Sequence, residues 1–426
     1  MSNVLVTTPL CVPSYFNAGH RLPIFVVAAY LRKQGHSVVA VDMASLSTTW
    51  KDLADLLVQN SFDIVAVLND FDLIEGFKRF VQYVREFSPQ AKIITFGRLS
   101  SVHTKWFHQY DIEGIVVAGD YEIGVAQFIR HLEFGDSPAG VQVNESNGWQ
   151  MPEKAGIFLP AEEWILPDIN EISYTSYDAL YSNDRRKFCG IPNRRELVVP
   201  LARGCPVGCN FCEVWQREGI IERRLSVDRV VEYIEKAFID EPFEYVSMYA
   251  PTFTLKKKWV RNLCNEFIIR DSKYPWKCTT TMFHLDKNLV RLMGQTGCFR
   301  ISIGLESFED AGVKSLPIHK HETKRRFDEL LCWCNEASIQ LNCFIMIGLP
   351  GTSVAGTRCM IDYLCKAGVR IRPSIFSDYS IIHPSMSEQE VVKVLSRHFL
   401  ADNANFSHEE RRQLYKLVFN LESIST

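Results

Sequence analysis

The chain has 426 residues, of which 46% are hydrophobic and 23% charged, as is typical of a globular protein with a buried core. A net charge of −3 gives no reason to expect nucleic acid or an acidic membrane as a partner, and no apolar run approaches the ~20 residues of a membrane-spanning helix. The first residues lack the basic start and apolar core of a signal peptide, so we expect a cytoplasmic protein whose 13 cysteines are reduced thiols or metal ligands.

The first 140 residues alternate apolar strands with helix-like segments. The strand-like runs are 3–7, 37–41, 62–68, 92–96 and 114–117, and helical segments are expected at 23–34, 50–59 and 76–87. Strands that are apolar throughout and alternate with helices predict a parallel, doubly wound sheet, which binds ligands at the carboxyl ends of its strands. No G-x-G-x-x-G follows the first strand, which disfavours a nicotinamide dinucleotide.

Residues 141–195 are predicted to be a linker. Glycine, proline and asparagine are frequent between residues 134 and 154, which indicates turns. The segment 174–195 is polar and aromatic, without a clear period.

A second series of strands and helices fills residues 196–385. Strands are expected at 196–202, 245–249, 276–282, 299–303, 340–347 and 369–376, and helices at 225–238, 259–269, 288–295, 321–337 and 353–367. Six such units predict a partial (β/α)6 barrel with its active site at the carboxyl ends of the strands. Two S-x-x-E capping boxes, at Ser387 and Ser407, then predict short helices within residues 386–426.

The most specific motif is C-x3-C-x2-C at Cys205, Cys209 and Cys212, directly after the first strand of this series. Thiolates favour iron–sulfur clusters or zinc. A cubane [4Fe–4S] cluster held by three cysteines keeps one iron open for a substrate or cofactor. The alternatives are a structural zinc site with Cys189 as the fourth ligand, and a non-catalytic iron–sulfur protein. The remaining cysteines lie mostly in apolar patterns and are expected to be buried thiols: Cys11, Cys264, Cys298, Cys332, Cys334, Cys343, Cys359 and Cys365.

The cysteine motif, with Phe211 before its last cysteine, resembles that of the radical S-adenosylmethionine (SAM) enzymes. In that family SAM chelates the open iron, and one electron cleaves it to release a 5′-deoxyadenosyl radical. The run Gly304-Leu305-Glu306-Ser307 resembles the fourth-strand turn that contacts SAM, and Gly348-Leu349-Pro350-Gly351 resembles the fifth-strand segment beside the adenine. The resemblance therefore implies a SAM site formed by Phe211, Tyr249, Thr280, Glu306, Ser307 and Gly348. Two departures are an Asp-Asp pair missing after the second strand and Thr279–Met282 in place of an arginine-containing run.

The first 140 residues resemble the cobalamin-binding domain that precedes many radical SAM cores. The similarity lies in 22–42, in Gly97 with His103, and in the turn 116–122, although the glycine-rich loop and the G-E-G-E-like turn are imperfect here. It implies cobalamin contacts from Asn69, Gly97, Ser100, Gly119 and Glu122. The D-x-H-x-x-G signature of a histidine-ligated cobalt is absent, so His20, His36 and His103 are expected to be ordinary loop histidines. A Rossmann-like domain that has lost its ligand is the alternative.

Together these features predict an α/β protein: a Rossmann-like cobalamin-binding domain (1–140), a linker or strap (141–195), a radical SAM core (196–385) and C-terminal helices (386–426). The resemblance implies [4Fe–4S], SAM and cobalamin as cofactors, and an external flavodoxin-like or ferredoxin-like electron donor. The expected reaction is methylation of an unactivated carbon of a small-molecule substrate, by way of the adenosyl radical and methylcobalamin. A non-methylating cyclisation or rearrangement is the alternative.

Overall fold

The computed structural model describes residues 1–10, 21–44, 48–70, 73–181, 194–272, 274–321, 323–376, 378–395 and 407–419. These residues fall into two compact units. The first lies within 1–193, 216–218 and 379–396, and the second within 194–215, 219–378 and 397–426. This division differs from the predicted one, because residues 141–181 of the expected linker belong to the first unit and the two C-terminal helices are divided between the units.

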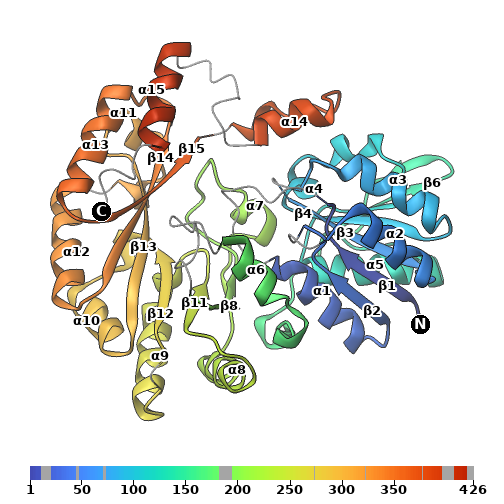
Figure 1. Ribbon diagram of the computed structural model, residues 1–426, viewed down its shortest axis with the longest axis horizontal. Coiled ribbons are helices and arrows are strands. Elements are labelled where there is room, and N and C mark those ends of the chain that lie inside the picture. Colours follow the sequence, from blue (N-terminus) through green and yellow to red (C-terminus); the bar gives the residue numbers. More distant parts are fainter. Residues whose placement is uncertain are drawn as a thin grey trace. The chain divides into compact units, whose positions relative to one another are not determined.

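A seven-stranded sheet with the order β2-β1-β3-β4-β5-β6-β7 forms the centre of the first unit (Figure 1). The first five strands are parallel, and the last two add an antiparallel edge. The strands are β1 (Asn3–Thr7), β2 (Ser37–Val41), β3 (Ile64–Asn69), β4 (Lys92–Gly97), β5 (Gly114–Val116), β6 (Val141–Glu145) and β7 (Gly148–Gln150). The helices are α1 (Leu22–Lys33), α2 (Trp50–Gln59), α3 (Phe77–Phe87), α4 (Arg98–Val102), α5 (Tyr121–Phe134), α6 (Tyr174–Tyr181) and α14 (Glu388–Leu395).

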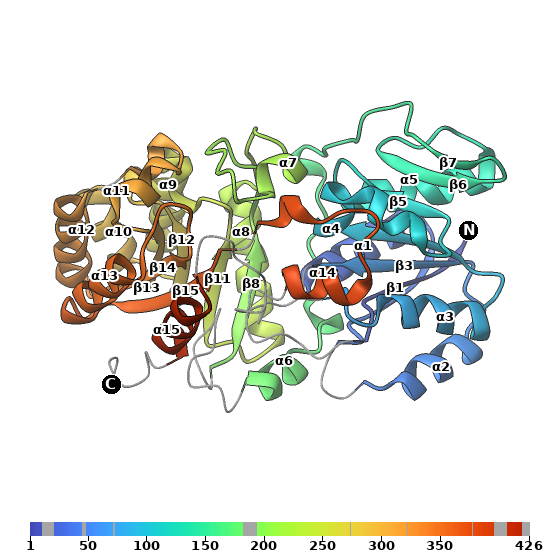
Figure 2. The same ribbon diagram turned by 90° about the horizontal axis from the view of Figure 1, so that it is seen from above.

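Helices cover both faces of this sheet, because its parallel strands are apolar on both sides. Helix α1 packs with α5, and α2 packs with α3 (Figure 2). Leu5 and Val65 lie in the core that includes α2 and α3, while Val4 and Val6 alternate with Leu5 and are also fully buried. The predicted doubly wound sheet is confirmed. Its strand order reverses between β1 and β3, where such folds bind ligands.

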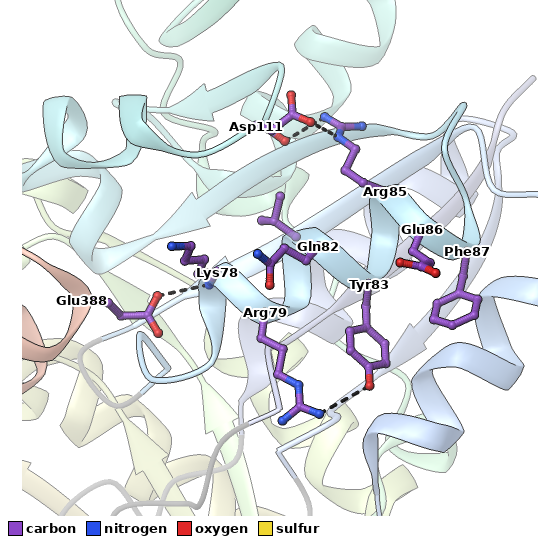
Figure 3. A pocket seen from close by; sticks show the side chains of 10 residues that line it. Lys78, Arg79, Gln82, Tyr83, Arg85, Glu86, Phe87, Asp111 and Glu388 are labelled. Carbon is purple, nitrogen blue, oxygen red and sulfur yellow. Dashed lines mark hydrogen bonds and ion pairs between the residues drawn. The ribbon is translucent and has the colours of Figure 1, made fainter.

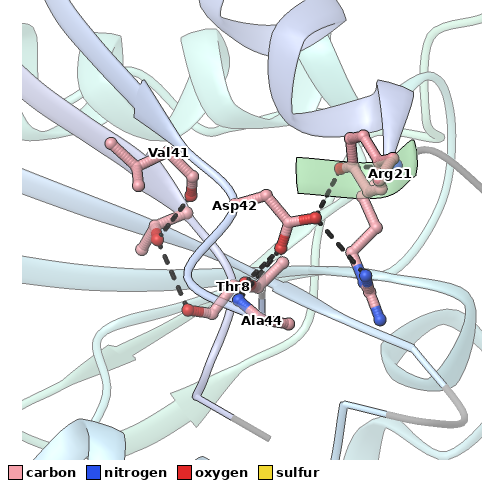
Figure 4. Close-up of polar contacts among 7 residues, drawn as sticks. Thr8, Arg21, Val41, Asp42 and Ala44 are labelled. Carbon is pink, nitrogen blue, oxygen red and sulfur yellow. Dashed lines mark hydrogen bonds and ion pairs between the residues drawn. The ribbon is translucent and has the colours of Figure 1, made fainter. Parts of the chain in front are cut away.

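A buried polar cluster ties α6 to the carboxyl ends of β1 and β2 (Figure 4). The Asp42 carboxylate accepts hydrogen bonds from Thr8 Oγ1 at 3.0 Å and from the Ala44 amide at 3.1 Å, and it pairs with Arg21 at 3.3 Å. The Tyr177 hydroxyl on α6 donates to the same carboxylate. Burial, followed by the negative charge of Asp42, raises the pKa of Tyr177 well above its usual value, so the hydroxyl stays protonated as a donor. Residues 174–181 of the predicted strap are therefore fixed to the first unit.

Helix α14 completes the core of the first unit, although nearly the whole second unit separates it from the rest in sequence. Val391 and Leu395 are buried in the core that includes α2 and α3. The Glu388 carboxylate accepts hydrogen bonds from the Gly76 amide and from the Tyr110 hydroxyl, each at 3.1 Å. The capping box predicted at Ser387 is present, since Ser387 and Glu390 bond reciprocally.

The second unit is built on a six-stranded parallel sheet with the order β15-β14-β13-β12-β11-β8. Its strands are β8 (Glu196–Pro200), β11 (Tyr245–Tyr249), β12 (Trp276–Thr280), β13 (Cys298–Glu306), β14 (Gln340–Ile347) and β15 (Arg370–Ile375). The accompanying helices are α7 (Val214–Glu218), α8 (Val227–Asp240), α9 (Lys257–Ile269), α10 (Lys287–Gln295), α11 (Asp310–Lys314), α12 (Lys324–Glu336), α13 (Val354–Lys366) and α15 (His408–Phe419). This is the predicted partial barrel with six strands.

Side chains on the two faces of this sheet differ in polarity. Helices α10, α12 and α13 lie along one face (Figure 1), where Ile301, Ile303 and Ile345 are fully buried. On the opposite, inner face Arg300 and Ser302 alternate with these along β13, and Phe344 and Met346 alternate along β14, as the period of two in a strand requires. Among the described residues, every helix is too short or too polar to span a lipid bilayer.

Candidate functional site

The cysteine loop follows β8 and the short strand β9 (Ala202–Arg203). Strand β9 pairs with β10 (Arg223–Arg224), so the chain is clamped on both sides of the loop. The Cys205 amide donates to the Gly219 carbonyl at 3.0 Å. Gly204 has a φ of +85°, and a Cβ there would lie 2.4 Å from the Ile221 carbonyl oxygen, so only glycine fits. The loop is therefore held by the residues that follow it.

The three cysteines of the loop are free thiols in a partly desolvated setting. Cys209 is buried, and Cys205 and Cys212 are half-buried. Burial is the main cause that raises the pKa of Cys209 to about 11 and of Cys212 to about 12, and the neighbouring cysteines contribute in the same direction. Desolvated thiolates need a positive partner, which a bound metal supplies, so the donor set fits an iron–sulfur cluster.

Within the described residues, no three or more His, Cys, Asp or Glu side chains are arranged to hold a single metal ion. In a cubane each thiolate binds a different iron, so the sulfur ligands stand further apart than those of one ion. The loop supplies three such ligands and leaves the fourth iron for another. Cys189, the suggested fourth zinc ligand, lies outside the described residues.

A buried ion pair supports the strand that closes the loop. Arg224 on β10 pairs with Glu222, and their side chains are only 1% and 4% exposed. Arg224 also donates to the carbonyls of Phe253 at 2.8 Å and Thr252 at 3.2 Å. Burial raises the pKa of Glu222, against the opposing effect of Arg224. Removing either partner would leave a buried charge alone, so the pair fixes the exit of the loop.

The inner face of the sheet carries a second ion pair, between Glu306 at the end of β13 and Lys320. The Lys320 ammonium donates to Glu306 Oε1 at 2.9 Å and to the Gly304 carbonyl at 3.0 Å, and both side chains are at least nine-tenths buried. Glu306 has a φ of +62°, an uncommon conformation for a residue with a side chain. A Cβ on Gly304 would lie 2.3 Å from Lys320 Nζ, so the glycine makes room for the ammonium.

Thr280 and Thr281, at and directly after the end of β12, differ in their hydrogen bonding. The Thr280 hydroxyl lies 2.5 Å from the hydroxyl of Thr254. The Thr281 Oγ1 is buried with no hydrogen-bond partner in the structure. A ligand at this edge of the sheet could therefore bond with Thr281, whereas the predicted Thr280 is already partnered.

The other predicted SAM contacts occupy the carboxyl ends of the strands. Ser307 follows β13, and its Oγ accepts a hydrogen bond from the Glu309 amide at 3.0 Å. Gly348 follows β14 with a φ of +80°. Tyr249 ends β11 with 58% of its surface exposed, and Phe211 is half-buried on the cysteine loop. Loops at this edge of a parallel barrel form its active site.

Three predicted cobalamin contacts in the first unit come together at the end of β3 and β4. Asn69 is fully buried, and its Oδ1 accepts hydrogen bonds from the amides of Leu99 at 3.1 Å and Ser100 at 2.9 Å. The Ser100 hydroxyl donates to the carbonyls of Gly97 and Val116, at 3.2 and 3.1 Å. A Cβ on Gly97 would lie 1.7 Å from the Asn69 carbonyl oxygen. These contacts shape the turn itself.

The other two lie at the end of β5. Gly119 has a φ of +88°, and a Cβ there would lie 2.6 Å from the Ile157 backbone, so the following chain packs against it. Glu122 is buried in the first turn of α5. The Asp120 carboxylate between them accepts a hydrogen bond from the Leu159 amide at 2.9 Å. The chain after β7 therefore covers this turn.

Two buried polar atoms after β4 and β5 have no hydrogen-bond partner in the structure. They are the Tyr121 hydroxyl and His103 Nε2. Burial raises the pKa of Tyr121 and lowers that of His103, so both side chains are neutral. Unpartnered polar atoms at the ligand-binding edge of a doubly wound sheet fit a large polar ligand. His36 instead accepts a hydrogen bond from the Ser2 amide at 3.2 Å, and His20 lies outside the described residues.

A surface hollow of about 1030 Å³ lies over α3, away from these groups (Figure 3). Three of its charged side chains bond to the protein itself: Arg85 pairs with Asp111 at 2.8 Å, and Glu388 accepts from the Lys78 amide at 3.1 Å. It contains no cysteine and lies on an outer helix of the first unit, so we do not assign chemistry to it.

Among the other cysteines, Cys264, Cys298, Cys334 and Cys343 are buried as predicted. Cys332 and Cys359 are exposed, because their helices α12 and α13 turn them away from the sheet, and Cys365 is half-buried. Cys11 lies outside the described residues.

Two buried polar groups of the candidate site, Lys320 and Thr281, were not predicted from the sequence. Thr281 is the neighbour of the predicted Thr280, and only the structure shows which of the two hydroxyls has a partner. Lys320 lies 14 residues after its partner Glu306, in an irregular segment without a motif. The one sequence signal for this pair was that the charges of Lys320 and Glu306 are opposite, and oppositely charged residues are too common to predict a specific contact.

Comparison with known proteins agrees with this geometry. Residues 199–364 match the family model of the Radical SAM superfamily, which implies a [4Fe–4S] cluster and SAM as cofactors. An uncharacterized methyltransferase of Pyrococcus horikoshii is 21% identical over 290 residues, which cover 68% of this chain and 61% of the relative. An anaerobic magnesium-protoporphyrin IX monomethyl ester cyclase of Rubrivivax gelatinosus is 24% identical over 313 residues, which cover 69% and 54%. The chain thus spans less than two thirds of the length of these relatives.

Among solved structures, the radical SAM methyltransferase TsrM of Kitasatospora setae, with cobalamin and a [4Fe–4S] cluster bound, superposes with a TM-score of 0.71 at 15% identity. The match covers 88% of this chain and 75% of TsrM. It extends well beyond the residues matched by the family model and therefore includes the fold of the first unit. Residues 199–364 thus form a radical SAM domain, in a chain whose fold combines a Rossmann-like first unit with a partial barrel like that of the radical SAM enzymes.

Proposed function

We propose that this protein is a cobalamin-dependent radical SAM enzyme that methylates an unactivated carbon of a small-molecule substrate. When bound, the cofactors supply a SAM-derived radical that removes a substrate hydrogen, and a methyl group carried on cobalamin. The observation that carries the proposal is the loop with Cys205, Cys209 and Cys212, clamped at the carboxyl edge of a six-stranded parallel sheet. Three thiolates leave one iron of a cubane free for SAM.

The residues around this loop have separate proposed roles. Glu306, held by Lys320, and Ser307 would bind the polar groups of SAM, and Gly348 would admit the adenine close to the backbone. Phe211, Tyr249 and Thr281 would complete the site, with Thr281 in place of Thr280 because its buried hydroxyl lacks a partner.

Cobalamin would be held at the carboxyl edge of the first sheet. Asn69, Gly97 and Ser100 would shape the loop that receives it after β4, and Gly119 and Glu122 the turn after β5. The unpartnered Tyr121 hydroxyl and His103 Nε2 support a polar ligand at this edge. The cobalamin-bound TsrM, whose fold the chain shares, supports the same assignment.

The decisive experiment is an anaerobic incubation of the iron-reconstituted protein with SAM, reductant and cobalamin. Roughly four irons per chain are expected, together with 5′-deoxyadenosine and S-adenosylhomocysteine in the presence of a methyl acceptor. The Cys209→Ala variant should lose the cluster and both products, whereas Cys332→Ala, which removes an exposed thiol on α12, should retain them. A single tightly bound zinc ion in the wild-type protein would refute the proposal.

A non-methylating cyclisation or rearrangement is the second candidate, because the relative from Rubrivivax gelatinosus is a cyclase. It predicts 5′-deoxyadenosine without S-adenosylhomocysteine in the same incubation. A non-catalytic iron–sulfur protein would give neither product.

The proposed partners are a small organic substrate and an external one-electron donor of the flavodoxin or ferredoxin type. A cytoplasmic setting would supply such a donor and protect the cluster from oxidation. Stimulation of 5′-deoxyadenosine formation by a reduced flavodoxin would support this assignment.

A further inference from the structure

Two exposed isoleucines follow the cysteine loop. Ile220 and Ile221 have 63% and 76% of their surface exposed. The backbone of Ile221 lies against the start of the loop, since its carbonyl oxygen would be 2.4 Å from a Cβ on Gly204. The Cys205 amide also donates to the Gly219 carbonyl, at 3.0 Å. The isoleucine pair is therefore an exposed apolar segment whose backbone packs beside a proposed cluster ligand.

A lysine from the connection between β11 and α9 lies next to the isoleucines. The Lys256 ammonium donates to the carbonyl of Glu222, the residue after Ile221, at 3.2 Å. Thr252, in the same connection, places its hydroxyl 3.8 Å from the Cys205 sulfur. Both segments therefore contact Cys205, and the hydrogen bond from Lys256 to Glu222 joins them into one surface.

The charge at this surface is positive. Lys256 and Lys258 are exposed, while Lys257 between them pairs with Asp286 at 3.4 Å. The carboxylate of the neighbouring Glu222 is buried in an ion pair, so it does not offset the two exposed charges. Lys256 is the N-cap residue of α9 without a capping hydrogen bond, and the first turn has no acidic residue. Because the amino end of a helix is itself positive, these lysines are unfavourable for α9, and helix stability does not explain them.

We propose that Ile220, Ile221, Lys256 and Lys258 form the docking surface for an acidic, low-potential electron-transfer protein. The inference rests on the proposed function, because it requires a cluster at the cysteine loop that an external donor reduces. An apolar centre with a polar rim is typical of protein interfaces, and exposed charges steer a partner of opposite charge. A donor docked there would lie beside the backbone of Cys205. One electron passes from the reduced donor to the cluster, the donor is oxidised by one electron, and no bond forms or breaks.

The charge of the surface favours this occupant over a second copy of the chain. A symmetric dimer would place the same patch of each copy against its counterpart, so that positive charge would face positive charge. Like charges across an interface are unfavourable, whereas an acidic partner offsets the exposed lysines.

The test compares two electron sources for the reconstituted protein: reduced flavodoxin, an acidic flavoprotein, and saturating dithionite. The readout is the initial rate of 5′-deoxyadenosine formation from SAM. In the double variant Lys256→Glu with Lys258→Glu, the flavodoxin concentration for half-maximal rate should rise roughly tenfold, because like charges then face each other. The rate with dithionite should stay unchanged, since a small reductant needs no docking surface. The matched control is Lys324→Glu with Arg325→Glu, which reverses two exposed charges in the first turn of α12 and should behave as the wild type with both reductants.

A binding measurement separates docking from turnover. Isothermal titration calorimetry with oxidised flavodoxin should show weaker binding by the lysine double variant than by the wild-type protein. Added salt should weaken the wild-type binding, because exposed charges are screened. The double variant Ile220→Ser with Ile221→Ser should also bind more weakly, with little change in the salt dependence, since it removes only apolar surface.

Equal flavodoxin binding by the wild-type protein and both double variants of the surface would overturn the inference. An equal loss in the α12 control would overturn it as well, because the effect would then come from net charge alone. Loss of the dithionite-driven reaction in the lysine variant would show that the lysines support the site itself and do not act in docking. Failure of the wild-type protein to form 5′-deoxyadenosine with dithionite would instead refute the proposed function.

Discussion

Single residues set the ligand-binding edges of both units through backbone conformation as much as through side-chain chemistry. Gly97 is an example, with a φ of +149° and the Asn69 carbonyl directly where a side chain would begin. The predicted role of Gly97 came from a resemblance, whereas the structure gives a reason within the chain for a glycine at this position. The structure also gives a reason for a glycine at position 304, because a side chain there would occupy the space of the Lys320 ammonium.

We expect Gly97→Ala to destabilise the first unit by more than ~4 kcal/mol, because it combines an unfavourable φ with overlap against rigid backbone. Gly35→Ala is the matched control, since Gly35 has a φ of +92° and open space around it. It should cost only ~1–2 kcal/mol, the backbone contribution alone. Urea unfolding followed by circular dichroism measures both, and equal losses would contradict the steric explanation.

At the scale of elements, the cysteine loop depends on the antiparallel pair β9 and β10. The three cysteines could be proposed as ligands from the sequence, because they lie within eight consecutive positions in one spaced motif. The clamp was not predicted, since β10 is only Arg223–Arg224 and carries no strand pattern of its own. Its stability comes from the buried pair of Arg224 with Glu222.

Arg224→Met should destabilise the second unit by ~3–5 kcal/mol, because it leaves the Glu222 carboxylate buried without its partner. The double variant Arg224→Met with Glu222→Met should recover part of this loss, as it removes both charges. Denaturant unfolding measures the loss and the recovery of stability. Iron content after reconstitution measures whether the cysteine loop still binds iron. A double variant no more stable than the single one would show that the ion pair is not the stabilising feature.

At the scale of the whole molecule, each unit draws on segments that are distant in sequence. Helix α14 belongs to the core of the first unit, and Trp106 marks the contact by donating its indole N–H to the Met386 carbonyl at 2.9 Å. The capping box predicted the helix itself, but a helix of eight residues has no sequence feature that identifies its packing partner.

Leu395→Ala should therefore destabilise the first unit by ~2–5 kcal/mol, as expected for a buried leucine that leaves a cavity. Lys393→Ala, on the exposed side of the same helix, is the control and should change stability by less than ~0.5 kcal/mol. Because the chain has eight tryptophans in the two units, the transition of this unit is followed by pulsed hydrogen exchange in urea, read by mass spectrometry of peptides from the first unit. An unchanged midpoint in Leu395→Ala would mean that α14 does not contribute to its core.

The sequence by itself determined the alternation of strands and helices in both units and the three cysteines proposed as cluster ligands. Both depend on local patterns: the period of apolar residues and the spacing of cysteines in one loop. The tertiary structure decided which of the Thr280 and Thr281 hydroxyls has a partner, that Lys320 meets Glu306, and which unit α14 completes. These depend on strand register and on contacts between distant segments, whose geometry is fixed only when the whole chain packs.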